Sequence, residues 1–253
     1  MARRLVAIGD STVEGLEDPR PDGSYRGWAD QLAAHLAVRE PGLTYANLAV
    51  RGRTVREVRE GQLPTALDLR PDVAVVVAGV NDLLRPRLDA AALREDLLHL
   101  HGELTAAGAQ TVTFTMPDMA RVAPMAVALR GRLRLLNEIT LEAGRRHGTL
   151  VVDLAAEPVA SHPALWHTDR LHGNAEGHRR IGLALAAALG CDVEDWRAPL
   201  EEPPARALPR VVLDELAWAR GHLLPWAWRH LRGRSSGDER ECKRPVLLPV
   251  EPA

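Results

Sequence analysis

The sequence predicts an α/β protein, a three-layer α/β/α sandwich built around a five-stranded parallel sheet. Over about the first 190 residues, short apolar or β-branched runs alternate with longer helical patterns, which is typical of βαβ units. One run, Val73–Ala78, is apolar at every position, as expected for a strand that helices cover on both faces. Five strands with right-handed crossovers indicate the three layers. A flavodoxin-like strand order, 2-1-3-4-5, is the preferred topology, although periodicity alone does not fix that order.

Each expected element has its own signal in the sequence. The strands are the short apolar runs Leu5–Ile8, Leu43–Leu48, Val73–Ala78, Thr111–Thr115 and Thr149–Asp153. Between them, apolar residues recur at helical spacing, as in Trp28, Leu32 and Leu36, in Leu93, Leu97, Leu100 and Leu104, and in Leu129, Leu133 and Leu136. Helix starts are marked by a capping box at Thr54–Glu57, by Asp89 and by Asn174.

Composition narrows the class of protein. The chain has 253 residues, of which 46% are hydrophobic and 26% charged, and its formal net charge is -2. This apolar fraction can repay the chain entropy, which excludes overall disorder, and the balanced charge argues against nucleic acid as a partner. Cys191 and Cys242 lie far apart with no CxxC spacing, so by themselves they form neither a disulfide framework nor a four-ligand zinc site.

The beginning of the chain bears on its location. The run Leu5–Ile8 is shorter than the about 7–15 apolar residues of a secretory signal, so we interpret it as a strand. No stretch approaches the about 18 uninterrupted apolar residues of a membrane-spanning helix. We therefore expect a soluble cytoplasmic protein.

The chain divides into one large domain, residues 1–195, and a C-terminal part of different texture. Residues 196–210 are rich in proline and acidic side chains, which indicates a linker. Residues 211–232 mix Trp218, Trp226 and Trp228 with arginines, as interfacial helices do. We expect this helical appendage to pack back on the domain or to make a dimer contact, with weak membrane-surface binding as a further alternative. Residues 233–253, rich in Gly, Ser, charge and Pro, are expected to be disordered.

Reactive side chains gather just after the predicted strands. In open parallel sheets, ligands bind at the carboxyl ends of the strands, so these positions are the ones to inspect. They hold Ser11 after the first strand, Gly52 after the second, Asn81 and Asp82 after the third, and Asp169 and His172 before the last helix. A hydroxyl, an imidazole, a carboxylate and potential oxyanion donors on one rim are an inventory for acyl transfer.

Four sequence blocks make the chain resemble the SGNH hydrolases, also called the GDSL esterase/lipase family. They are GDS at Gly9–Ser11, the glycine block at Gly52, GxND at Gly79–Asp82 and DxxH at Asp169–His172. A lone GDS is frequent by chance, but four blocks at strand ends in a fixed order are specific. The resemblance spans residues 4–190, with threonine after Ser11 where the name-giving motif has leucine, and HGN where members often have HPN.

The resemblance implies a catalytic triad. Ser11 would be the nucleophile, at a strand-to-helix turn that exposes its hydroxyl. His172 would act as the general base and return the proton to the leaving alkoxide. Asp169 would hold the imidazole tautomer and stabilise the imidazolium.

The resemblance also implies an oxyanion hole and supporting carboxylates. The donors would be the backbone N–H groups of Ser11 and Gly52 and the side-chain amide of Asn81. Gly52 suits this role because no Cβ blocks the approach of a substrate. Asp10 and Asp82 would support the site from the adjoining turns.

Two further residue groups could take part in a site. Met116, Pro117 and Met119 follow the fourth strand and either line the acyl pocket or fill the core beneath a loop. A crowded segment offers the potential metal ligands His162, His167, Asp169, His172 and His178. Because it contains no HExxH or CxxC spacing, we expect no metal site.

The function expected is that of a serine esterase that hydrolyses carboxylic esters of small or short-chain acyl groups through an acyl-Ser11 intermediate. It would need no cofactor, and its partner would be a small-molecule ester. Two alternatives stay open: an acyltransferase that uses the same acyl-enzyme, and a non-catalytic binding module that keeps the rim as a ligand groove. The intact set Ser11, Asp169 and His172 argues against the binding module.

Overall fold

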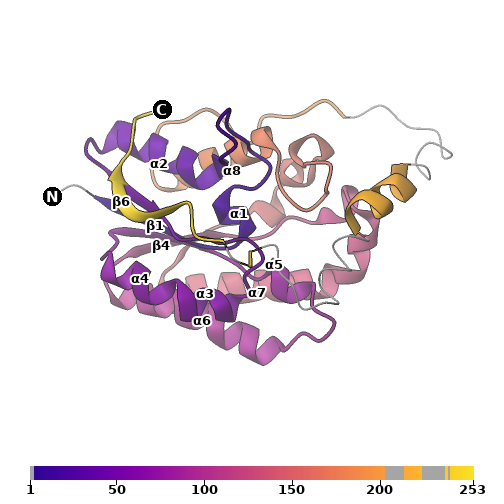
Figure 1. Cartoon of the computed structure of the whole chain (residues 1–253), viewed down its shortest axis with the longest axis horizontal. Helices are drawn as coiled ribbons and strands as arrows, with labels where there is room; N and C mark the ends of the chain where they lie inside the picture. The colour runs from indigo at the N-terminus through magenta and orange to yellow at the C-terminus, as the bar shows by residue number, and fades with distance from the viewer. Residues whose placement is uncertain (1–2, 203–213, 224–236, 239) are drawn as a thin grey trace.

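The computed structural model describes residues 3–202, 214–223, 237–238 and 240–253 (Figure 1). Its centre is a six-stranded sheet in the order β5-β4-β3-β1-β2-β6. The five expected strands are β1 (Arg4–Gly9), β2 (Thr44–Asn47), β3 (Val73–Val77), β4 (Gln110–Phe114) and β5 (Leu150–Val152). All four pairings among them are parallel, which confirms the predicted order 2-1-3-4-5.

Helices cover both faces of the sheet, so the predicted three-layer sandwich is also confirmed (Figure 1). One layer contains α1 (Ser11–Glu14), α2 (Gly27–Arg39) and α8 (Ala175–Ala188). The other contains α3 (Val55–Gly61), α4 (Leu63–Asp68), α6 (Ala90–Ala106) and α7 (Arg130–His147). Short helical turns follow β3, β4 and β5, namely α5 (Val80–Leu83), η1 (Met119–Arg121), η2 (Pro124–Leu129), η3 (Leu154–Ala156), η4 (Pro158–Ser161) and η5 (Pro163–Leu165).

The periodic apolar residues form the core, as expected from their spacing. The four leucines of α6 that follow the helical repeat are each between 0 and 3% exposed, and every residue of β3 is buried. Burying a leucine side chain contributes roughly 1.5–3 kcal/mol relative to leaving it exposed. The repeat therefore stabilises α6 against the sheet rather than as an isolated helix.

The predicted helix starts are confirmed as well. The capping box at Thr54–Glu57 is complete, with side chains and backbone groups bonded in both directions. Asp89 accepts a hydrogen bond from the backbone N–H of Ala92 at the start of α6. Asn174 likewise accepts a hydrogen bond from the backbone N–H of Gly177 at the start of α8, the helix that follows the loop with Asp169 and His172.

The expectation of disorder over 233–253 is wrong for its last part. Residues Arg244–Pro249 form β6, an antiparallel strand on β2. Residues Arg244–Pro249 contain two prolines, a residue that is rare inside strands. Proline is nevertheless tolerated on an edge strand, whose outer N–H groups need no partner. Lys243, in an ion pair of 2.8 Å with Asp30, and Arg244, whose Nε donates to Tyr45 O at 2.8 Å, fasten the strand to the domain.

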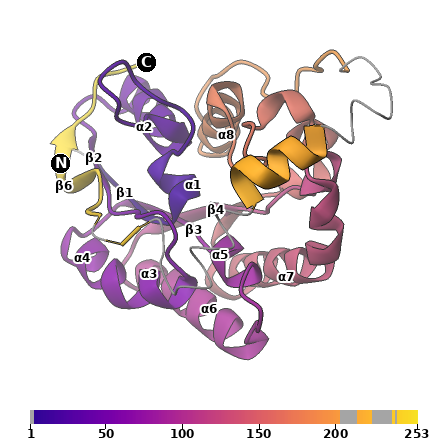
Figure 2. The ribbon, with the colours of Figure 1, turned by 45° about the vertical axis from the view of Figure 1, so that its right-hand side comes forward.

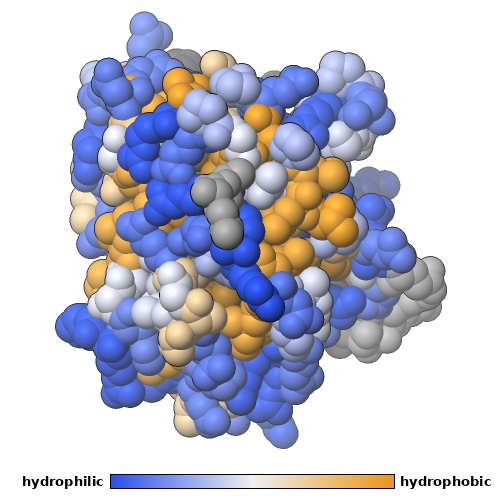
Figure 3. Space-filling model, turned by 90° about the vertical axis from the view of Figure 1, so that its left-hand side faces the viewer, coloured by the Kyte–Doolittle hydropathy of each residue, from blue (hydrophilic) through white to orange (hydrophobic). Residues whose placement is uncertain are grey.

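β6 closes the open edge of β2, which would otherwise present unpaired backbone groups to solvent. The face on which β6 lies carries apolar patches among hydrophilic residues (Figure 3). Val246 and Leu248 of β6 are 53% and 46% exposed, so the new edge remains partly apolar.

The expected linker and appendage are described in part. Trp196, at the start of the expected linker, is 5% exposed and belongs to the core, so the domain continues into that segment. Residues 203–213 and 224–236 lie outside the described residues. Residues 214–223 are helical, ending in the turn η6 (Ala219–Leu223), the orange helix in Figure 2. In the part of the chain that is described, no helix is both long and apolar enough to cross a membrane.

Candidate active site

Ser11 lies directly after β1, at the first position of α1. The turn into the helix depends on Gly9, whose φ is +153° and whose missing Cβ would lie 2.1 Å from the carbonyl oxygen of Val77 on β3. Asp10 caps the helix by accepting a hydrogen bond from the backbone N–H of Thr12 at 3.0 Å. Ser11 is thereby held at the carboxyl edge of the sheet, 9% exposed.

Ser11, His172 and Asp169 form a continuous hydrogen-bonded chain. Nε2 of His172 lies 2.8 Å from Oγ of Ser11, across 161 positions of sequence. Nδ1 of the same ring lies 2.7 Å from Oδ2 of Asp169. The structure therefore brings the three predicted triad residues together in the order that acyl transfer requires.

The loop between η5 and α8 is built around the Asp169 carboxylate. Its Oδ1 accepts from the backbone N–H groups of Leu171 and His172 at 3.0 and 3.1 Å. Burial by itself would raise the pKa of Asp169, but the hydrogen bond and electrostatic attraction of the His172 ring and the two backbone bonds hold this pKa well below its usual range. Asp169 is therefore an anion that can hold Nδ1 protonated and leave Nε2 free to accept a proton.

Three predicted oxyanion donors border the same space. Ser11, as the first residue of α1, carries one of the N–H groups that a helix leaves without an intrahelical partner. Gly52 has a φ of +77°, a left-handed conformation that favours glycine. The side-chain nitrogen of Asn81 donates to Oδ2 of Asp10 at 3.1 Å and to the carbonyl oxygen of Arg53 at 3.0 Å. Because both of its N–H bonds are engaged, Asn81 must exchange one of them to reach an oxyanion.

Of the two predicted supporting carboxylates, Asp10 is buried and Asp82 is half-buried. Asp10 is 1% exposed, and burial raises its pKa from the ordinary value despite its hydrogen bonds to Thr12 and Asn81. Oδ2 of Asp82 accepts from the backbone N–H of Val55 at 3.0 Å, and burial raises the pKa of Asp82 to about 6. Asp10 therefore joins the Ser11 turn to Asn81, and Asp82 joins the turn after β3 to the start of α3.

Gln62, at the junction of α3 and α4, is a functional neighbour that sequence reasoning missed. Its side-chain amide donates to the carbonyl oxygen of Gly9 at 2.9 Å and accepts from the N–H of Gly9 at 2.8 Å. These two bonds satisfy both backbone groups of the residue two positions before the nucleophile. No local pattern marks Gln62, because its partner lies 53 positions away.

A cavity of about 770 Å³ opens beside Ser11 and His172. Apolar side chains form most of its wall, and Met116, Pro117 and Met119 are among the residues that line it, as one of the two interpretations expected. The same wall includes the polar side chains of Ser11, Asn81 and His172 and the residue Gly52. An apolar cavity with a few convergent polar groups is typical of a small-molecule site.

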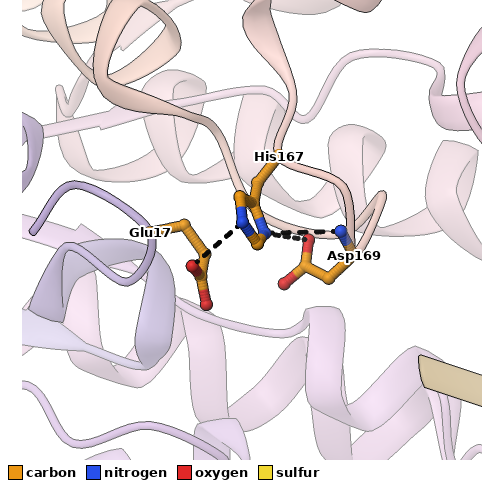
Figure 4. Close-up of side chains that lie close together, drawn as sticks. All are labelled: Glu17, His167 and Asp169. Carbon is orange, nitrogen blue, oxygen red and sulfur yellow. Dashed lines mark hydrogen bonds and ion pairs between the residues drawn. The ribbon is translucent and has the colours of Figure 1, made fainter. Parts of the chain in front are cut away.

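Among the described residues, one group could offer three ligands to a metal ion: Glu17, His167 and Asp169 (Figure 4). Nε2 of His167 lies 3.3 Å from Glu17, and its Nδ1 accepts from the backbone N–H of Asp169 at 3.3 Å. His167 thus contacts both Glu17 and Asp169, and Asp169 also holds His172. His178 lies elsewhere, buried between the N–H of Trp28 and the carbonyl of Leu16.

Comparisons with known proteins identify the family of the chain. The model of the GDSL-like Lipase/Acylhydrolase family matches residues 7–180. A comparison with curated proteins finds no match.

Solved structures share the fold. LAE5, an alpha/beta hydrolase enzyme from the metagenome of Lake Arreo, Spain, is 26% identical, with a TM-score of 0.63 over 75% of this chain and 95% of that one. The lipase/acylhydrolase from Enterococcus faecalis is 21% identical, with a TM-score of 0.60 over 74% and 95% of the two chains. Axe2, an acetylxylan esterase from Geobacillus stearothermophilus, is 20% identical, with a TM-score of 0.60 over 77% and 95%. The chain therefore belongs to the GDSL-like lipase/acylhydrolase, or SGNH hydrolase, family and is an ester hydrolase of that type.

Proposed function

We propose that the protein hydrolyses carboxylic esters through a covalent acyl-Ser11 intermediate, with His172 as general base and Asp169 as its orienting carboxylate. The observation that carries the proposal is the chain of hydrogen bonds of 2.8 and 2.7 Å from Ser11 through His172 to Asp169. Serine alone is a poor nucleophile at neutral pH, so a base at this distance is what it needs.

In the first half-reaction, Oγ of Ser11 attacks the ester carbonyl carbon and its proton passes to Nε2 of His172. The oxyanion accepts hydrogen bonds from the backbone N–H groups of Ser11 and Gly52. It also accepts one from the Asn81 amide, once this amide gives up its bond to Asp10 or to the carbonyl of Arg53. As the carbon–oxygen bond to the alcohol breaks, His172 returns the proton to the departing alkoxide. A water molecule then attacks the acyl carbon and passes a proton to Nε2 of His172. As the bond to Oγ breaks, His172 returns this proton to Ser11 and the acid is released.

The cavity supports esters whose acyl part is apolar. A volume of about 770 Å³ lies in the upper part of the about 300–1,000 Å³ range of ligand pockets. Short-chain esters, including acetyl esters, fit such a space, and so do longer acyl chains. The substrate class proposed is thus a neutral ester with an apolar acyl chain, and no charged group of the acyl part is needed for binding.

A fluorophosphonate probe tests the nucleophile directly. We expect stoichiometric labelling of the full chain at Ser11 and no labelling of Ser11→Ala. Wild-type protein that stays unlabelled while correctly folded would refute the proposal in favour of a binding module. Product analysis with added alcohols then separates hydrolysis from acyl transfer, because a transferase forms a new ester at the expense of free acid.

A further inference from the structure

The helical segment 214–223 borders the cavity although it lies beyond residues 7–180, which match the family model. Trp218 and Gly221 belong to the cavity wall. Nε1 of Trp218 donates to the backbone carbonyl oxygen of Asp169 at 3.1 Å, so the indole lies against the loop that carries Asp169 and His172. The segment is the orange helix in Figure 2.

An ion pair fastens this segment to the same loop. Nη1 of Arg170 lies 2.7 Å from each carboxylate oxygen of Glu215, and the two side chains are 16% and 33% exposed. The Arg170 guanidinium also lies 4.8 Å from the centre of the Trp218 ring, a cation–π distance. The guanidinium thus holds both Glu215 and Trp218 next to the cavity.

The anchor residue has an unusual backbone conformation. Arg170 has a φ of +62°, which a non-glycine residue adopts only at a cost that its surroundings must offset. Arg170 lies between Asp169 and His172 in sequence. Its side chain contacts Glu215 and Trp218, whereas Asp169 and His172 belong to the triad. The contacts of Arg170 with Glu215 and Trp218 are among the interactions that can offset this backbone cost.

We propose that Trp218 is a specificity-determining residue of the proposed ester hydrolysis, an apolar wall for longer acyl chains that the Arg170–Glu215 pair holds against the cavity. The inference rests on the proposed function and adds to it the residue that selects chain length. An acetyl group is bound close to Ser11 and gains little from a distant wall. A longer chain gains apolar contact with the indole, and this contact is available only while the appendage is docked.

The test compares kcat/KM for p-nitrophenyl octanoate and acetate, whose leaving groups are identical, in the full-length protein. If Trp218 contacts about two methylene groups, Trp218→Ala lowers the octanoate-to-acetate ratio about tenfold, mainly through KM of the octanoate. Trp218→Phe restores most of the ratio. Glu215→Gln, which keeps the shape and removes the charge, lowers the ratio about threefold by loosening the dock.

Leu216→Ala is the matched control, because Leu216 lies on the same helix, is 63% exposed and is not part of the cavity wall. Its ratio is expected to equal that of the wild type. If the octanoate-to-acetate ratio of both Trp218→Ala and Glu215→Gln lies within twofold of the wild type, the inference is overturned. Segment 214–223 then has a structural role only. Should Trp218→Ala not fold, Glu215→Gln decides alone. Failure of the proposed function is distinguishable, since wild-type Ser11 would then resist the fluorophosphonate probe.

Discussion

Asp169→Asn tests the proposed mechanism by replacing one carboxylate oxygen of the triad with an NH2 group while preserving its loop. In the wild type, Oδ1 of Asp169 accepts from the backbone N–H groups of Leu171 and His172, and Oδ2 accepts from Nδ1 of His172 at 2.7 Å. An asparagine keeps the oxygen for the two backbone groups. Its NH2 group then faces Nδ1 of His172, which must accept a hydrogen bond and so leaves the ring proton on Nε2.

The size of the effect follows from that tautomer. With a proton on Nε2, the ring cannot take the proton of Ser11 Oγ, which lies 2.8 Å away. In a Ser-His-Asp protease the same exchange lowers kcat about 10⁴-fold, which corresponds to about 5.4 kcal/mol in the activation free energy. We expect a loss of that order for Asp169→Asn, with KM nearly unchanged.

The assay is steady-state hydrolysis of p-nitrophenyl acetate, together with the thermal midpoint of unfolding. Asp22→Asn is the matched control, because Asp22 caps an exposed turn through Ser24, remote from the cavity wall. It should retain wild-type kinetics. If Asp169→Asn retained kcat within tenfold of the wild type, the carboxylate would not orient His172 and the triad reasoning would fail.

Three further predictions concern the surroundings of the triad. Asn81→Ala should lower kcat by about 10²–10³-fold in steady-state kinetics, since one oxyanion donor is worth about 2.7–4 kcal/mol; an effect on KM alone would remove Asn81 from that role. Gln62→Leu should lower the free energy of unfolding, measured in urea, by about 1–3 kcal/mol, because it leaves the buried N–H of Gly9 without a partner, whereas the carbonyl of Gly9 still accepts from the N–H of Val50 at 3.3 Å; an unchanged midpoint would contradict this. Burial raises the pKa of Asp82 to about 6, against 3.8 ordinarily. The contribution of Asp82 to the free energy of unfolding is therefore fully present below about pH 4 and is lost as the pH rises through 6. Between those pH values the wild type should lose about 3 kcal/mol of its free energy of unfolding, measured in urea at each pH, and Asp82→Asn should not show this loss. Identical pH profiles of the two proteins would contradict the prediction.

The layers of the fold were predictable because they depend on short-range patterns. A run that is apolar throughout, such as Val73–Ala78, must be buried on both faces, and β3 is. The leucine repeat of α6 and the capping box at Thr54–Glu57 likewise act within a few residues of their own positions. β6 was missed since the prolines and charges of its sequence are compatible with an edge strand only if a neighbouring edge is available.

The candidate site was predictable where residues stand at strand ends. Ser11 and His172 meet because β1 and the loop before α8 both end at one edge of the sheet, a consequence of parallel topology. Gln62 was not predictable, because nothing near it in the chain shows that its amide brackets Gly9. The part of the cavity wall that Trp218 contributes was also out of reach, since the same Trp and Arg composition suits a membrane surface, a dimer contact or an intramolecular dock.

The amino-acid sequence by itself determined the α/β sandwich, its strand order by analogy and the identities of the reactive side chains, because hydrophobic periodicity, helix caps and motifs are local properties of the chain. Tertiary structure alone decided that β6 closes the edge of β2, that Gln62 holds the turn before the nucleophile, and that Trp218 borders the cavity through Arg170. Such contacts join residues far apart in the chain, and their free energy depends on which surfaces the fold leaves open, a quantity that no local pattern carries.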